Sequence, residues 1–344
     1  MAYTTIDDPS AYFHTQLYTG NGSNRTITND ANAGDFKPDW LWVKHRNHST
    51  AHSHNIADTT RGGTKTLYTN TSDKEETISN GLTGFATDGF TLGTNGAVNG
   101  GSVNYVAWQW KANGGATSTN NDGGNTSTVQ ANTTAGFSIV SYTRDSNSVT
   151  TVGHGLGKTP KVKIEKDRDT GSTNWSFITS ASGSDQYGFL NTTATFGSTT
   201  SGFTSTVFRS AMGANQGAII AYVFAEIQGY SKFGIYEGNG STDGAFVYTG
   251  FKPSFIIMKP TNQSTEWTLQ DTVRDPINPA NKRLIPNDSI AEYTNTSCLT
   301  DFLSNGFKMR TNHPSNNSSG YTYFYMAFAE HPFVSSEGVP VTAR

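Results

Sequence analysis

The densest group of side chains that could do chemistry is a set of four histidines within ten residues: His45, His48, His52 and His54. They are half of the eight histidines in the chain. Neutral imidazole is a good ligand for Zn, Ni or Cu ions, and alternate residues such as His52 and His54 share one face of a strand. The spacing sets no acidic partner, so we interpret the segment first as a polar loop. The primary expectation is that this segment binds no metal. If it does bind one, these four histidines are the candidate ligands.

Two acid–base pairs with the same spacing form a second group. Asp58 and Arg61 are three residues apart, and so are Asp271 and Arg274. Such a pair near the end of a strand usually closes a turn or forms an ion pair, and a ligand-binding role is the alternative. Residues 175–182 form a stretch equivalent to those around the two pairs, but it has Thr179 and Ser182 in place of the aspartate and the arginine. We therefore treat the pairs as structural or ligand-binding residues.

Catalytic motifs are absent from the sequence. Gly153–Lys158 has the glycine spacing of a dinucleotide loop, but it precedes an expected strand and not a helix, so we interpret it as a turn. The single cysteine, Cys298, excludes an intrachain disulfide and a cysteine-based zinc site, and we expect it in the core. The sequence predicts no enzyme, no catalytic residues and no cofactor.

The elements that position these residues are indicated by a pattern that occurs three times. A proline is followed by apolar residues two and four positions later and by a lysine at the sixth, in Pro38–Lys44, Pro160–Lys166 and Pro253–Lys259. A period of two is typical of strands. In the middle copy, Lys163 and Glu165 alternate with apolar residues, and we expect them to face water.

The residues around this pattern also recur, which predicts three units of about 90–100 residues, a normal size for a β-sandwich. Each unit has a turn after its first strand and ends in an aromatic strand, such as Tyr105–Trp110. A stretch rich in Gly, Asn, Ser and Thr separates the first two units. The expected division is an N-terminal arm (1–12), repeat 1 (13–112), a linker (113–136), repeat 2 (137–228), repeat 3 (229–333) and a C-terminal tail (334–344).

Composition agrees with an all-β chain. Charged residues make up only 15% of the sequence and glycine occurs 36 times, whereas aromatic residues reach 12%. Turn-forming and β-branched residues favour strands over helices. We predict three tandem β-sandwich (jelly-roll-like) repeats with little helix. Trp40, Trp42, Trp108 and Trp110 lie on expected strands, and we place them in the core in preference to a sugar-stacking surface.

Charge and hydropathy narrow the classes of partner. The net charge is −3 at pH 7 and no run of Lys and Arg occurs, so nucleic-acid binding is not expected. The first residues lack the basic and apolar regions of a signal peptide. The longest apolar stretch is far shorter than the ~20 residues of a membrane helix, so no membrane insertion is expected.

Several segments resemble a repeat domain of virion structural proteins from marine tailed bacteriophages of the cyanophage and pelagiphage type. The resemblance covers almost the whole chain and rests on these segments: Asp7–Phe13, Tyr18–Ser23, Phe36–Trp40, Tyr105–Ala112, Gly229–Gly234, Phe302–Lys308 and Met326–Glu330. It implies a particle component that is synthesised in the bacterial cytoplasm and ends on the virion surface. It implies no defined catalytic residues.

Three functions follow as hypotheses. The first is a non-enzymatic virion structural protein, either a tail fibre or spike or a capsid-surface decoration, whose partners are other capsid or tail proteins. The second is a carbohydrate-binding adhesin for a host surface glycan. A glycan depolymerase comes last, because its two carboxylates would have to lie ~5–9.5 Å apart and Asp58 and Asp271 belong to different units. We also expect a homo-oligomer, with a trimer as one form; alternatively, the three units themselves imitate a trimer.

Overall fold

The computed structural model describes residues 2–30, 36–144, 149–210, 217–294 and 296–340. Strands account for 44% of the chain and helix for 2%. The only helical elements among the described residues are a 3₁₀ turn, η1 (Pro9–Ala11), and a single α-helical turn, α1 (Gly96–Asn99). The all-β prediction is confirmed. None of the described helices is long and apolar enough to cross a membrane.

Unit 1 (residues 13–112) contains a six-stranded antiparallel sheet covered by a smaller sheet of three strands. In spatial order the strands of the large sheet are β1 (Phe13–Thr19), β9 (Asn104–Trp110), β3 (Trp40–His45), β4 (Asn55–Asp58), β5 (Lys65–Tyr68) and β6 (Glu76–Thr77). Those of the small sheet are β2 (Arg25–Thr28), β8 (Gly89–Leu92) and β7 (Leu82–Ala86).

Unit 2 contains a sheet of eight strands and a two-stranded ribbon. The large sheet runs β10 (Ser118–Asn120), β11 (Ser127–Asn132), β12 (Phe137–Arg144), β19 (Gly217–Phe224), β14 (Val162–Asp167), β15 (Ser176–Thr179), β16 (Gln186–Phe189) and β17 (Gly197–Ser198). The ribbon is β13 (Thr151–Gly153) with β18 (Val207–Arg209). The expected linker 113–136 is therefore not a free connection, because β10 and β11 extend the edge of this sheet. Unit 2 accordingly starts at residue 113.

Unit 3 (residues 229–333) contains a four-stranded sheet, a three-stranded sheet and a short ribbon. The four strands are β20 (Ser231–Glu237), β28 (Thr322–Pro332), β22 (Phe251–Pro260) and β23 (Thr268–Asp271). The three are β21 (Phe246–Tyr248), β27 (Gly306–Met309) and β26 (Thr300–Leu303), and the ribbon is β24 (Lys282–Arg283) with β25 (Tyr293–Thr294).

The three large sheets share a strand order. In each, the first long strand pairs with the last strand of the unit, which pairs with the lysine-terminated strand, which pairs with the strand that follows it. The registers also correspond: Trp40 faces Trp110, Val162 faces Phe224, and Phe255 faces Phe328. An origin by internal repetition stays a prediction, but the three lysine strands do occupy matching places.

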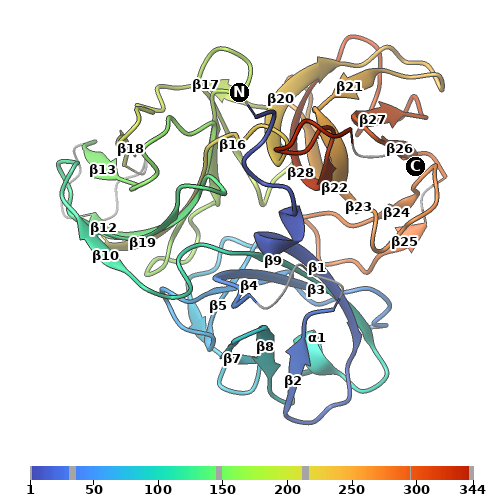
Figure 1. Cartoon of the computed structure of the whole chain (residues 1–344). Coiled ribbons are helices and arrows are strands. Elements are labelled where there is room, and N and C mark those ends of the chain that lie inside the picture. Colours follow the sequence, from blue (N-terminus) through green and yellow to red (C-terminus); the bar gives the residue numbers. More distant parts are fainter. Residues whose placement is uncertain (1, 31–35, 145–148, 211–216, 295, 341–344) are drawn as a thin grey trace.

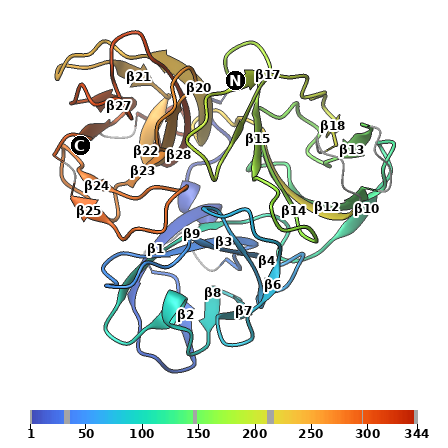
Figure 2. The same ribbon diagram turned by 180° about the vertical axis from the view of Figure 1, so that it is seen from behind.

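The units form sandwiches, but they are not separate bodies. Each has its own apolar core between its large and small sheets. A further and larger core contains side chains of all three units, among them Trp40, Phe224 and Phe255. Figures 1 and 2 show the three lobes meeting around this centre. The large sheets are therefore covered on both faces, on one side by the small sheet and on the other by the neighbouring units. The prediction of sandwich units did not specify this shared core.

This double coverage also corrects the expected exposure of the middle lysine strand. Lys163 and Glu165 do not face water, since they are 0% and 2% exposed. They form an ion pair of 3.0 Å inside the sandwich of unit 2, and Tyr142 donates a hydrogen bond to Glu165. The Lys163 ammonium also lies 4.7 Å from the centre of the Phe208 ring. A period of two identified the two faces of the strand but could not show that both are buried.

The N-terminal arm lies against unit 3 and the end of unit 2. Tyr3 donates a hydrogen bond to the carbonyl of Gly250, and Thr4 to the carbonyl of Gln228. Asp7 accepts hydrogen bonds from the backbone and hydroxyl of Ser336, in the C-terminal tail. Residues 341–344 of that tail lie outside the described residues. The N-terminal arm and the C-terminal tail are therefore in direct contact at Asp7 and Ser336.

Candidate functional site

The terminal lysines of the three lysine strands lie at the contact surfaces between units, which we call seams. Each ammonium donates to a backbone carbonyl of the neighbouring unit: Lys44 of unit 1 to Ser289 of unit 3, Lys166 of unit 2 to Ser72 of unit 1, and Lys259 of unit 3 to Thr193 of unit 2. The contacts run in one direction around the centre. Burial lowers the pKa of Lys44 to about 7 and the pKa values of Lys166 and Lys259 to about 8.

The first Asp–Arg pair lies in the seam between units 1 and 2. Asp58 and Arg61 are both fully buried and pair at 2.5 Å, and Arg61 also binds Glu75 at 3.1 Å. Unit 2 contributes Arg168, 2.8 Å from Glu75, and Tyr222, whose hydroxyl donates to Asp58 at 2.7 Å. Burial opposes the charge on Arg61, but Asp58, Tyr222 and Glu75 raise its pKa.

The second pair has matching partners in the seam between units 3 and 1. Asp271 and Arg274 pair at 2.5 Å, and Arg274 binds Glu292 at 2.9 Å. Unit 1 contributes Arg46, 2.8 Å from Glu292, and Trp108, whose indole N–H donates to Asp271 at 3.1 Å. In both seams the carboxylates are occupied by bonds to arginine and to a donor from the next unit. The geometry thus favours the ion-pair interpretation of the pairs over a catalytic one.

The third seam, between units 2 and 3, uses aromatic contacts instead. The register places Thr179 where Asp58 and Asp271 stand. Met326 occupies the place of Trp108 and Tyr222, and it offers no polar hydrogen. Phe177 packs on Trp267 with ring centres 5.0 Å apart, and the Trp267 indole donates to the carbonyl of Phe189. The acid missing from unit 2 is therefore matched by a missing donor in unit 3.

Three of the four clustered histidines come together, but not around a metal position. The rings of His45, His48 and His52 have centres 4.6–5.8 Å apart. The Lys44 ammonium lies 2.8 Å from Nε2 of His45, and burial followed by this cation lowers the pKa of His45 to about 3. His54 lies apart and accepts a hydrogen bond from Trp42. Within the described ranges, no group of three His, Cys, Asp or Glu residues is arranged to hold a metal.

Two other residues considered from sequence are structural. Cys298 is fully buried, its sulfur lies 3.3 Å from Nδ1 of His313, and burial raises its pKa. His154, in the glycine-rich segment, is buried beside Phe208 and belongs to the sandwich of unit 2. All six tryptophans are at most 1% exposed, so the assignment of Trp40, Trp42, Trp108 and Trp110 to the core is confirmed.

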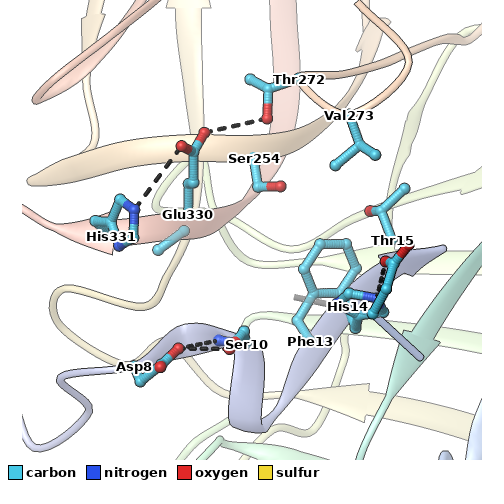
Figure 3. A pocket seen from close by; sticks show the side chains of 12 residues that line it. Asp8, Ser10, Phe13, His14, Thr15, Ser254, Thr272, Val273, Glu330 and His331 are labelled. Atoms are coloured by element: carbon cyan, nitrogen blue, oxygen red, sulfur yellow. Dashed lines mark hydrogen bonds and ion pairs between the residues drawn. The ribbon is translucent and has the colours of Figure 1, made fainter. Parts of the chain in front are cut away.

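A polar cleft of about 380 Å³ opens between units 1 and 3 (Figure 3). Its charged and imidazole side chains are contributed by the N-terminal arm, β1, the segment after β2 and the end of β28: Asp8, His14, Asp30, Glu330 and His331. Glu330 binds Lys252 at 2.6 Å and accepts from Thr272 at 3.2 Å. Burial lowers the pKa of His14, which leaves its ring neutral at pH 7.

Sequence reasoning missed the partners that complete the seams and all of the residues of this cleft. One signal was available for the seams: Arg46 and Arg168 each stand two residues after a strand lysine, whereas Thr261 stands there in the third copy. No comparable spacing marks the cleft, because its walls come from opposite ends of the chain.

The model of a domain of unknown function, DUF7483, matches residues 8–332. No curated protein matches the sequence. The family match covers all three units and both sides of every seam.

Proposed function

We propose that this chain, which belongs to the DUF7483 family, is a non-enzymatic structural protein of a bacteriophage virion, displayed on the outside of the particle. The observation that supports a structural role is the use of its ionisable side chains. Asp58, Arg61, Asp271 and Arg274 are all turned into seams, where they join one unit to the next. The assignment to a virion rests on the sequence resemblance.

The closed arrangement of the units bears on the proposed assembly. Three units within one chain surround a common core, as three subunits of a trimer would. This arrangement supports the alternative in which the units imitate a trimer, and a homo-oligomer built from such bodies remains part of the proposal. On a particle that carries many copies of the chain, the weak contacts of the individual copies would together give strong attachment.

Neither of the two other hypotheses gains support from the residues first considered for it. A depolymerase built on Asp58 and Asp271 gains no support, because the two carboxylates lie in different seams and each is paired with an arginine. Tryptophan stacking on a glycan gains none either, because all six tryptophans are buried. An adhesin would have to use another surface.

Quantitative mass spectrometry of purified mature particles tests the structural proposal. We expect the chain at a fixed copy number per particle and accessible to antibody on intact particles. Its absence from mature particles, with abundance only in infected cells, would contradict the proposal. If the chain is present in mature particles, a reconstruction of the particle would assign it to a fibre, a spike or the capsid surface.

A further inference from the structure

We propose that the cleft between units 1 and 3 binds an uncharged oligosaccharide. The proposal goes beyond the structural role and is independent of it, since the cleft would bind the same ligand on or off a particle. Its volume, about 380 Å³, is in the range of small-molecule sites.

The walls of the cleft are held in place before any ligand arrives. Asp8 accepts hydrogen bonds from the backbone and hydroxyl of Ser10 at 2.9 and 2.6 Å and so caps the turn η1. On the opposite wall, Glu330 is fixed by Lys252 and Thr272. A site whose polar groups are already oriented loses less conformational entropy on binding.

A buried hydroxyl in the cleft wall has no hydrogen-bond partner among the described residues. It belongs to Thr15, which is only 4% exposed and whose Oγ1 is left unpaired by that part of the chain. In Figure 3 the hydroxyls of Thr15 and Ser254 point toward the same space from opposite sides of the cleft. An unpaired buried hydroxyl carries a free-energy cost. A ligand hydroxyl that reached this wall would remove that cost.

The charge of the cleft selects the class of ligand. Three carboxylates line the cleft, those of Asp8, Asp30 and Glu330, and Lys252 pairs with Glu330 alone. Hydrogen-bond acceptors therefore exceed donors, and a phosphate, sulfate or uronic acid would be repelled. Sugar hydroxyls donate readily to carboxylates. Val273, which is 41% exposed, adds apolar surface on which the C–H face of a sugar ring packs.

A second hollow extends the site. It measures about 270 Å³, shares Thr272 with the cleft and is lined further by Lys252, Asp275, Pro276, Ile277, Asn278 and Phe302. Ile277 is 75% exposed at this end. Two hollows that share a residue accommodate a chain of sugars better than a single one. The proposal therefore specifies an oligosaccharide.

Isothermal titration of the full chain with four probes tests the proposal: maltotriose, cellotriose, trigalacturonic acid and trilysine. We expect at least one neutral trisaccharide to bind with a Kd of about 1 mM or lower, and trigalacturonic acid not to bind. No binding of either neutral trisaccharide at about 10 mM would overturn the proposal. Binding of trilysine alone would overturn it in favour of a basic peptide.

Three variants locate the binding. Ser254→Tyr, which fills the cleft, should weaken binding by about tenfold or more, and Glu330→Gln by about fivefold. Glu226→Gln is the matched control, because Glu226 is also 30% exposed and paired with a lysine, Lys232. Equal weakening by Glu226→Gln would contradict the site, provided that thermal melting shows all variants folded. Since particle composition is not measured here, failure of this test leaves the structural proposal standing.

Discussion

The indole N–H of Trp108, in unit 1, donates to the carboxylate of Asp271, in unit 3, at 3.1 Å. Both side chains are buried, and the Arg274 guanidinium that pairs with Asp271 also lies 5.5 Å from the Trp108 ring. A single residue of one unit thus completes the ion pair of the next. The Tyr222–Asp58 bond repeats this relationship one seam further around. The units consequently depend on each other for the satisfaction of buried charge.

Removal of a seam carboxylate should destabilise the whole chain. Asp58→Ala leaves Arg61 buried with only Glu75 as its anion, and it also removes the acceptor of Tyr222. Breaking a buried pair from one side costs about 3–5 kcal/mol, so we expect a loss of about 3 kcal/mol in urea unfolding. Asp243→Ala is the control, because Asp243 is 77% exposed and its ion pairs are on the surface. A control that loses as much stability as Asp58→Ala would refute this explanation.

A carboxylate introduced into the seam between units 2 and 3 should destabilise the chain unless an arginine is introduced with it. Thr179→Asp places a charge at a position that is 1% exposed. Three residues later the chain has Ser182 and not an arginine that could pair with this charge. We expect a loss of several kcal/mol. Adding Ser182→Arg restores the spacing of Asp58 and Arg61 and should recover about 1–3 kcal/mol in a double-mutant cycle. Ser184→Arg, at an exposed position, should recover nothing; equal recovery by both arginines would show that the spacing is irrelevant.

Stability should rise with pH between about 7 and 9.5. In the folded chain the pKa of Lys44 is about 7 and those of Lys166 and Lys259 are about 8, against 10.5 for an unperturbed lysine. In this window the unfolded chain binds more protons, so the free energy of unfolding increases as pH rises and decreases as pH falls. The slope should approach about 1.4 kcal/mol per pH unit for each lysine that is neutral when folded.

Urea unfolding at successive pH values measures that slope. Lys166→Met should reduce it, whereas Lys158→Met, at an exposed position, should leave it unchanged. A flat stability profile between pH 7 and 9.5 would mean that the three seam lysines remain charged in the folded chain.

Much of the fold could be predicted from local patterns, because strand formation depends on neighbouring residues. The period of two around Trp40 and Trp42 identified a core strand, and composition identified an all-β chain. What covers each face depends on residues far away in the sequence. Lys163 looked solvent-facing because its acceptor, the carbonyl of Arg209, is 46 residues distant.

The candidate site was predictable only in part, for the same reason. The spacing of Asp58 and Arg61 correctly indicated an ion pair, but Tyr222 lies 164 residues from Asp58. Proximity of the histidines in sequence suggested a common ligand, whereas the buried ammonium of Lys44 occupies the space beside His45. Glycine and asparagine in 113–136 suggested a linker, yet backbone pairing with β12 makes β11 a strand.

The central claim is that three units fold as one cooperative body around a shared aromatic core, and differential scanning calorimetry of the full chain tests it most directly. Trp40, which packs on Tyr222 with ring centres 4.5 Å apart, provides the variant, since Trp40→Ala should cost about 3–5 kcal/mol. We predict a single transition whose van't Hoff and calorimetric enthalpies agree, and which Trp40→Ala moves as a whole to lower temperature. Two or three transitions, with Trp40→Ala lowering only the one that belongs to unit 1, would contradict the claim.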